Sequence, residues 1–222
     1  MKLVFALHHV NDDALRSPEL RHRLRAAGAR RLQLNLDDEA VAAAQLRLST
    51  GTTITAVVSV WSDGEVGPIA DAVLGIDPTA DGWLVEERSP LPPPDVPDGD
   101  RADVLANVAF LRRPDGMPPA DWTAYWLDEH TTIAIETQGT FGYVQNPVLE
   151  AVTADAPAVA GIVEELFPMA ALGDLHAFYG SGGDDAELQR RLGRMLDSVA
   201  RFGADRDLDL VPTSRYVFTL PD

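Results

Sequence analysis

The chain has 222 residues and a net charge of −17 at pH 7. This size allows one large domain or two small ones, and the negative charge disfavours nucleic acid and membrane surfaces as partners. The absence of cysteine excludes disulfides, thiolate zinc sites and thiol nucleophiles. No stretch approaches the roughly 18 apolar residues of a membrane span, and the N-terminus has no signal-peptide pattern, so we expect a cytoplasmic protein.

The first part of the chain predicts the order strand, helix, strand, strand, helix, strand. Runs of apolar and β-branched residues indicate the strands, and Ser17 followed by Pro18 is typical of a helix start, with Gly28 after the helix end. The expected strands are residues 2–8, 31–36, 53–61 and 83–87, and the expected helices are residues 18–27 and 67–74.

A proline-rich segment divides the chain nearly in half. Five prolines fall within residues 90–97, a density that favours an extended spacer and forbids a helix or a sheet ladder. We therefore interpret residues 1–89 as an N-terminal repeat, residues 90–100 as a linker and residues 101–222 as a second domain.

The second half repeats the order strand, helix, strand, strand, helix, strand. The last helix is the clearest, because Asp184 caps it, apolar residues recur every three or four positions, and Gly203 follows it. The expected strands are residues 105–112, 140–144, 161–167 and 214–220, and the expected helices run from Pro118 to before Gly139 and from residue 185 to residue 202.

The shared order, with faint similarity of residues 4–9 to 108–113 and of 54–64 to 162–173, indicates a duplication. A βαββαβ unit leaves one face of its sheet bare, on the order of 350 Å² of it, and such a face seldom stays exposed. We predict an α+β fold in which two ferredoxin-like βαββαβ repeats form an intramolecular, pseudo-dimeric α/β barrel. The space between the two sheets is the expected pocket, suited to a flat, largely apolar molecule.

One helix of the second half concentrates aromatic residues. At about 100° per residue, Trp122, Trp126, Glu129 and Ile133 share one face, and His130 lies on its flank.

Four motifs in the second half resemble the EthD-type family of the dimeric α/β-barrel superfamily. They are residues 122–130 (WTAYWLDEH), 142–146 (GYVQN), 161–164 (GIVE) and 201–202 (RF), and the likeness covers residues 105–220. The resemblance implies a cofactor-free barrel related to polyketide cyclases, dehydratases, decarboxylases, lactone isomerases and quinone-forming monooxygenases. The first half lacks these motifs and has Ala26 where His130 would fall, so we interpret it as a degenerate copy.

Three residues are candidates for catalysis. His130 is either a general acid or base, since imidazole titrates near neutral pH, or a cap on the C-terminus of its helix. Tyr143 lies in a strand, where alternate side chains face the expected pocket, and its hydroxyl could orient or protonate a ligand oxygen. Glu164 either faces solvent or sits in the pocket with a raised pKa, and the family resemblance favours the pocket.

Five further residues are candidates for binding substrate. Trp122 and Trp126 either line an aromatic cavity or belong to the core. Arg112 either holds a carboxylate or enolate or is a solvated strand end. Gln145 and Asn146 are possible hydrogen-bonding partners of a ligand, although Asn146 followed by proline also suits a plain turn.

The sequence shows no metal-binding pattern. His8 and His9 are expected on opposite faces of a strand and could not bind one ion together. Together with the EthD-type resemblance, which implies a cofactor-free barrel, this predicts an enzyme without metal or cofactor. We expect it to act on a flat, oxygenated polyketide-like or aromatic molecule, with His130 moving a proton during cyclisation, dehydration or decarboxylation. The alternatives are a cofactor-free monooxygenase of polyphenols and a non-catalytic small-molecule-binding protein. Haem degradation is a weaker option, because the sequence places no histidine specifically as an axial ligand. A homodimer is an open option.

Overall fold

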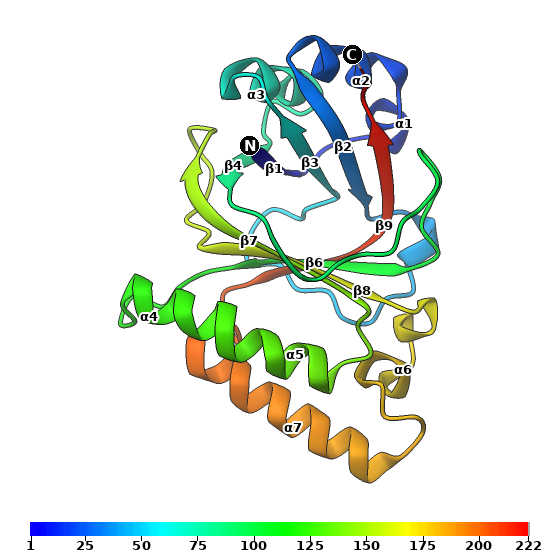
Figure 1. Ribbon diagram of the computed structural model, residues 1–222, viewed down its shortest axis with the longest axis vertical. Coiled ribbons are helices and arrows are strands. Elements are labelled where there is room, and N and C mark those ends of the chain that lie inside the picture. The colour runs from blue at the N-terminus through cyan, green and yellow to red at the C-terminus, as the bar shows by residue number, and fades with distance from the viewer. Residues whose placement is uncertain (222) are drawn as a thin grey trace.

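The computed structural model describes residues 1–221 and shows one closed β-barrel with helices on two opposite sides (Figure 1). The strands are β1 Lys2–Leu7, β2 Ala29–Leu36, β3 Ala56–Ser62, β4 Asp81–Val85, β5 Arg88–Leu91, β6 Leu105–Leu111, β7 Gly142–Ala151, β8 Gly161–Phe167 and β9 Asp209–Thr219. The α-helices are α1 Asp12–Leu15, α2 Pro18–Ala26, α3 Val66–Leu74, α4 Pro119–Ala124, α5 Thr131–Thr137, α6 Leu175–Tyr179 and α7 Asp185–Phe202. A π-helical segment, η2 Tyr125–His130, joins α4 to α5, and short 3-10 turns are η1 Glu39–Val41 and η3 Met169–Leu172.

The barrel consists of two sheets with the same internal order. The first half contributes β4-β1-β3-β2 and the second half contributes β9-β6-β8-β7, with antiparallel neighbours throughout. Strand β2 pairs with β9 and β4 pairs with β7, which closes the ring. This is the strand order of a ferredoxin-like unit used twice, so the predicted fold class is confirmed.

Several elements differ in length from the prediction. Strand β7 continues to Ala151 because its second part pairs with β4, and β9 begins at Asp209 because its first part pairs with β6. Both extensions depend on strands that are distant in sequence. The short elements α1, α6, η1 and η3 were not predicted, since such short segments carry no readable periodicity. Among residues 1–221, no helix combines the length and apolar character that crossing a bilayer requires.

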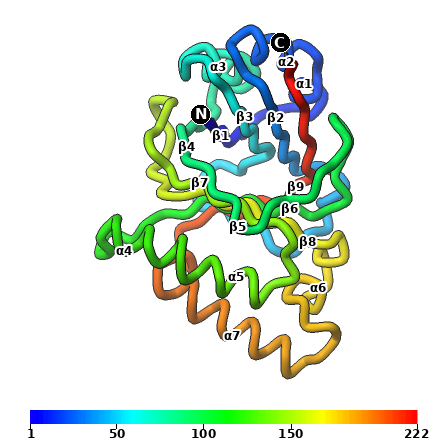
Figure 2. The backbone as a smooth tube through the Cα atoms, in the orientation of Figure 1, coloured from blue at the N-terminus to red at the C-terminus, as the bar shows by residue number. Residues whose placement is uncertain are grey.

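The start of the proline-rich segment is a strand. Residues 90 and 91 belong to β5, which pairs with β7, so the expectation that no ladder forms there is wrong. Pro90 is tolerated because β5 is an edge strand, where a missing N–H is not needed. Figure 2 shows the following segment, in green, running from β5 toward β9, where the Gly99 N–H donates to the Val217 carbonyl at 2.7 Å.

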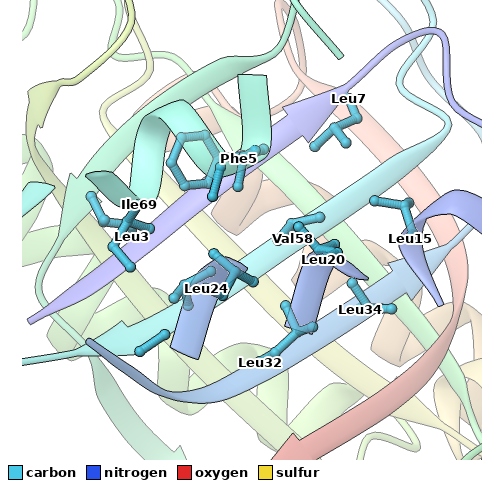
Figure 3. Close-up of a cluster of buried hydrophobic side chains, with 14 of the residues drawn as sticks. Leu3, Phe5, Leu7, Leu15, Leu20, Leu24, Leu32, Leu34, Val58 and Ile69 are labelled. Atoms are coloured by element: carbon cyan, nitrogen blue, oxygen red, sulfur yellow. The ribbon is translucent and has the colours of Figure 1, made fainter. Parts of the chain in front are cut away.

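Both faces of each sheet are covered, and strand alternation divides the residues between them. On β1, Leu3, Phe5 and Leu7 point outward and pack against α2 and α3 (Figure 3), whereas Val4 and Ala6 point into the barrel. The outer layer of the first half is filled by leucines and valines that are fully buried.

The middle of the barrel is filled by side chains. Glu164 accepts hydrogen bonds from Gln33 Nε2 and Asn35 Nδ2, each at 2.9 Å, and from Arg215 Nε at 3.1 Å. The cavity beside this network measures only about 10 Å³. The expected space between the sheets is therefore closed at its middle, because an eight-stranded barrel is only just wide enough to hold its own side chains. Separate cavities of about 300 Å³ and 490 Å³ remain at its two ends.

Candidate functional site

The candidate site lies outside the barrel, between the second sheet and the helices that cover it. A cavity of about 300 Å³ opens there beneath η2, α6 and α7. Its apolar walls include Ala109, Leu111, Trp126, Val163, Phe178, Met195, Val199, Phe202, Leu208 and Leu210. Its polar groups are those of His130, Gln138, Tyr143, Glu165, Tyr179 and Asp205. Apolar walls with a few converging polar groups are the usual composition of a small-molecule site.

The π-helical segment η2 determines where His130 points. The Thr131 N–H donates to the carbonyl of Trp126, five residues back, and the Thr131 hydroxyl donates to the same oxygen at 2.9 Å. This wider turn places Trp126 and His130, four residues apart, together on the buried face, while Glu129 is exposed. The predicted helix face, which included Glu129, is wrong at that position because it assumed α-helical spacing throughout. Such π-turns are frequent at functional sites.

His130 is held by the neighbouring helix α7. Its side chain is 7 % exposed, its Nδ1 lies 2.9 Å from Ser198 Oγ, and its ring centroid is 4.6 Å from that of Phe202. Tyr125 contributes its hydroxyl to the same serine oxygen at 3.2 Å. The alternative that His130 caps a helix end is wrong, because the helical segment continues through α5.

Burial controls the charge of His130. Loss of hydration lowers its pKa from 6.5 to about 4, so the ring is neutral at neutral pH. Among residues 1–221, its Nε2 has no hydrogen-bond partner. When Nδ1 carries the hydrogen and donates to Ser198, Nε2 presents a lone pair; when Ser198 donates instead, Nε2 presents an N–H.

A polar row crosses three adjacent strands on the helix-facing side of the second sheet, and two of its members, Tyr143 and Glu165, line the cavity. Asn107 on β6 pairs in register with Glu165 on β8, and Glu165 pairs with Tyr143 on β7. Asn107 is buried, and neither polar atom of its amide has a partner among residues 1–221. With its nitrogen turned toward the carboxyl group, the Gln138 amide donates to Glu165 Oε1 at 2.9 Å.

The two acidic groups of this row have shifted pKa values. Burial raises the pKa of Glu165 from 4.5 to about 7, with the Gln138 amide partly opposing the shift. Burial also raises the pKa of Tyr143, and the nearby charge of Glu165 adds to that increase. At neutral pH the site therefore contains a phenol, a neutral imidazole and a carboxyl group close to its midpoint of ionisation.

The predicted catalytic residues do not meet in one place. His130 and Tyr143 line the cavity, but the expectation that Tyr143 faces the space between the sheets is wrong, since its side chain points to the helix layer. Glu164 points the other way, into the barrel network with Arg215. Its neighbour Glu165 occupies the site instead.

The sequence pattern alone could not show that Glu165, and not its neighbour Glu164, lines the cavity. Glu164 and Glu165 are adjacent in a strand that is covered on both faces, so alternation sends one to each side without indicating which side holds a cavity. Asn107 and Ser198 carry no motif and were also missed. Asn107 could have been noticed as the polar residue in an apolar strand.

The predicted binding residues are distributed over three places. Trp126 lines the cavity, and Trp122 packs behind it with ring centroids 5.1 Å apart, which matches the core alternative for Trp122. Gln145 lies in the same layer and donates to Thr131 Oγ1 at 2.6 Å. Asn146 points into the barrel, and Arg112 forms an ion pair of 2.7 Å with Asp209 at one barrel end.

The rim of the cavity is apolar and includes residues from the first half. Leu46 and Leu48 are 41 % and 42 % exposed, and Leu196 on α7 is 54 % exposed. The segment holding the first two is fixed by backbone hydrogen bonds in both directions between Leu48 and Leu210, at 3.1 Å and 2.9 Å. The N-terminal repeat therefore helps to form the entrance.

No metal centre accompanies these groups: within residues 1–221, no three histidine, aspartate or glutamate side chains are placed to hold an ion.

Comparison with known proteins identifies the fold. No protein-family model and no curated protein matches the sequence. Among solved structures, an anthrone oxidase-like protein is similar with a TM-score of 0.51 and 10% identity, over 100% of this chain and 94% of that chain. A provisionally assigned monooxygenase from Fusobacterium nucleatum subsp. nucleatum has a TM-score of 0.51 and 8% identity, over 98% and 93% of the two chains. These likenesses show the fold, an α/β barrel made of two ferredoxin-like units within one chain.

Proposed function

We propose that this protein is an enzyme that binds a flat, oxygenated and largely apolar molecule in the cavity under η2 and α7 and removes a proton from a carbon next to its carbonyl group. The observation that carries the proposal is the convergence of His130, Tyr143 and Glu165 on one apolar cavity of about 300 Å³. Buried titratable groups with shifted pKa values are characteristic of sites that move protons.

Glu165 is the better base of the two candidates. A general base works best when its pKa lies near the working pH, and burial raises the pKa of Glu165 to about 7. His130, with a pKa of about 4, is neutral and only weakly basic. Its role is to hold a ligand oxygen or to pass a proton on to Ser198, to which it is hydrogen-bonded.

Tyr143 completes the step. As the base removes the proton, negative charge develops on the ligand's carbonyl oxygen, and a neutral donor aimed at that oxygen stabilises the transition state. The raised pKa of Tyr143 keeps its hydroxyl protonated and able to donate. The resulting enolate then leads to cyclisation, dehydration or decarboxylation, reactions that the EthD-type motifs over residues 105–220 support.

A second candidate shares the same first step. An anthrone loses a proton from its methylene carbon, and the carbanion reacts with O₂ to give a quinone; one oxygen atom becomes the new carbonyl and the other leaves as water with the two methylene hydrogens. The folds of an anthrone oxidase-like protein and of this chain are alike at a TM-score of 0.51, which makes anthrone a reasonable probe.

The test uses anthrone in D₂O with NMR detection of methylene exchange, together with an oxygen electrode. We expect the protein to accelerate exchange and Glu165→Gln to reduce that acceleration by about 10²- to 10⁴-fold, the usual contribution of a positioned base. Glu150→Gln, an exposed carboxylate on β7, is the matched control and should leave the rate unchanged. Oxygen uptake together with exchange would favour the second candidate function, oxidation of the anthrone to a quinone.

Exchange that persists at the wild-type rate in Glu165→Gln refutes the assignment of the base. Saturable binding of anthrone with no exchange and no oxygen uptake would instead indicate the non-catalytic binding protein.

A further inference from the structure

A second cavity, of about 490 Å³, lies at the barrel end crossed by the proline-rich segment. It is separated from the candidate site by the sheet itself, since its lining comes from the inner faces of β2, β7, β8 and β9. Its apolar lining consists of Pro92, Pro93, Pro94, Val96, Val144 and Val217. Two arginines, Arg31 and Arg215, border the same space.

Two ion pairs form at this end. Lys2 Nζ lies 3.0 Å from Glu87 Oε1, and Arg215 Nε lies 3.1 Å from Glu164 Oε1. Arg31 differs: among residues 1–221 it has no carboxylate within 4.0 Å and no side-chain hydrogen bond. One positive charge of the inner wall therefore lacks a partner.

Arg31 is nevertheless held in position. Its guanidinium group lies over the ring of Trp61, 4.2 Å from the centroid, and the indole Nε1 of Trp61 donates to Glu87 Oε2 at 2.6 Å. Burial lowers the pKa of Arg31 and the positive charge of Arg215 lowers it further, whereas the more distant carboxylates of Glu87, Glu164 and Asp95 oppose the shift. Arginine is seldom buried without a partner, so an oriented, half-buried arginine beside a second arginine is typical of an anion site.

Arg215 can supply a second contact. Its Nε and Nη2 atoms are used by Glu164 and by Gln33 Oε1, the latter at 2.9 Å, whereas its Nη1 has no acceptor among residues 1–221. The two guanidinium groups thus offer unused N–H donors to one cavity, and a planar carboxylate matches such donors in geometry.

We propose that this barrel-end cavity binds an organic monocarboxylate, with its carboxylate on Arg31 and Arg215 and its apolar part against the proline-rich segment and the two valines of β7 and β9. The acidic neighbours argue against an anion of higher charge. Glu87, Asp95, Asp98 and Glu164 also line the cavity, and they repel a multiply charged ion such as phosphate more strongly than a monocarboxylate.

Isothermal titration with benzoate tests the proposal. We expect saturable binding that weakens at least tenfold in Arg31→Gln and by less in Arg31→Lys, which keeps the charge but loses the fork of donors. Arg25→Gln, an exposed arginine on α2, is the matched control and should bind as the wild type does. Benzyl alcohol and inorganic phosphate should not saturate the site.

Glu165→Gln should bind benzoate with wild-type affinity, which places the ligand in the barrel end and not in the candidate active site. Without ligand, Arg31→Gln should melt no lower than the wild type, because an unpaired buried charge has been removed. Absence of saturable benzoate binding by the wild type, or equal affinity in Arg31→Gln, overturns the proposal. So does a fall of several degrees in Tm for Arg31→Gln with unchanged affinity, since Arg31 would then be structural.

Discussion

Replacement of Glu165 by glutamine should stabilise this protein at neutral and alkaline pH. Burial raises the pKa of the Glu165 carboxyl group from 4.5 to about 7, because the charged form is poorly hydrated between the sheet and the helices. Glutamine resembles the protonated carboxyl group in shape and in hydrogen bonding, and it carries no charge at any pH. The variant therefore isolates the cost of ionising this one group.

The direction of this stability change follows from the pKa values of the Glu165 carboxyl group in the unfolded and the folded chain. Below pH 4.5 the carboxyl group is protonated in both the folded and the unfolded chain, and the substitution has little effect on the free energy of unfolding. Between pH 4.5 and about 7 only the unfolded chain ionises, so the wild type loses stability that the variant keeps. At 1.36 kcal/mol per pKa unit the difference reaches about 3 kcal/mol, an upper value because the group is partly exposed.

The measurement is urea unfolding of both proteins from pH 4 to pH 8.5, with the difference in free energy plotted against pH. Glu150→Gln serves as the control and should give a flat line, because that carboxylate is exposed. A flat line for Glu165→Gln as well would show that Glu165 ionises normally in the folded protein, and the proposed base would lose its physical support.

Three other substitutions test the surroundings of the site and the barrel. His130→Gln should show the opposite pH dependence, because folding lowers the pKa of His130 from 6.5 to about 4. The wild type therefore loses stability as the pH drops from 6.5 toward 4, whereas the variant does not. Chemical unfolding of both proteins at pH 4.5 and 7.5 measures this difference, and equal changes in their free energies of unfolding would contradict it. Glu164→Ala leaves Arg215 buried without its carboxylate and should lower the free energy of unfolding by about 3 to 5 kcal/mol. A measured loss below about 1 kcal/mol, the size typical of exposed ion pairs, would disprove this prediction. Gly161→Ala places a methyl group 2.4 Å from the ring of Trp126 and should destabilise the protein by about 1 to 3 kcal/mol. We expect a changed near-ultraviolet circular dichroism spectrum, and an unchanged spectrum would show that the ring can move away freely.

The two glutamates of β8 illustrate how the fold separates neighbouring side chains. Glu164 enters a barrel network that is satisfied by an arginine and two amides, whereas Glu165, one residue later, faces a cavity with a raised pKa. A strand that is covered on only one face would have left one of them in water. Here both faces are buried, and the same dipeptide serves a structural and a proposed chemical role.

The sequence by itself determined the repeated order of strands and helices, because apolar periodicity, capping residues and turn formers are local properties. It also indicated His130, Tyr143 and Trp126, which the fold brings to one cavity. Tertiary structure decided the rest. Closure of the barrel through β2–β9 and β4–β7 filled the middle of the space between the sheets and left cavities at its two ends, the π-turn at η2 rotated His130 inward, and helices on the outer face created the candidate site there. These outcomes depend on which distant segments meet, since a strand buried on both faces has no local signal for the side on which a ligand can fit.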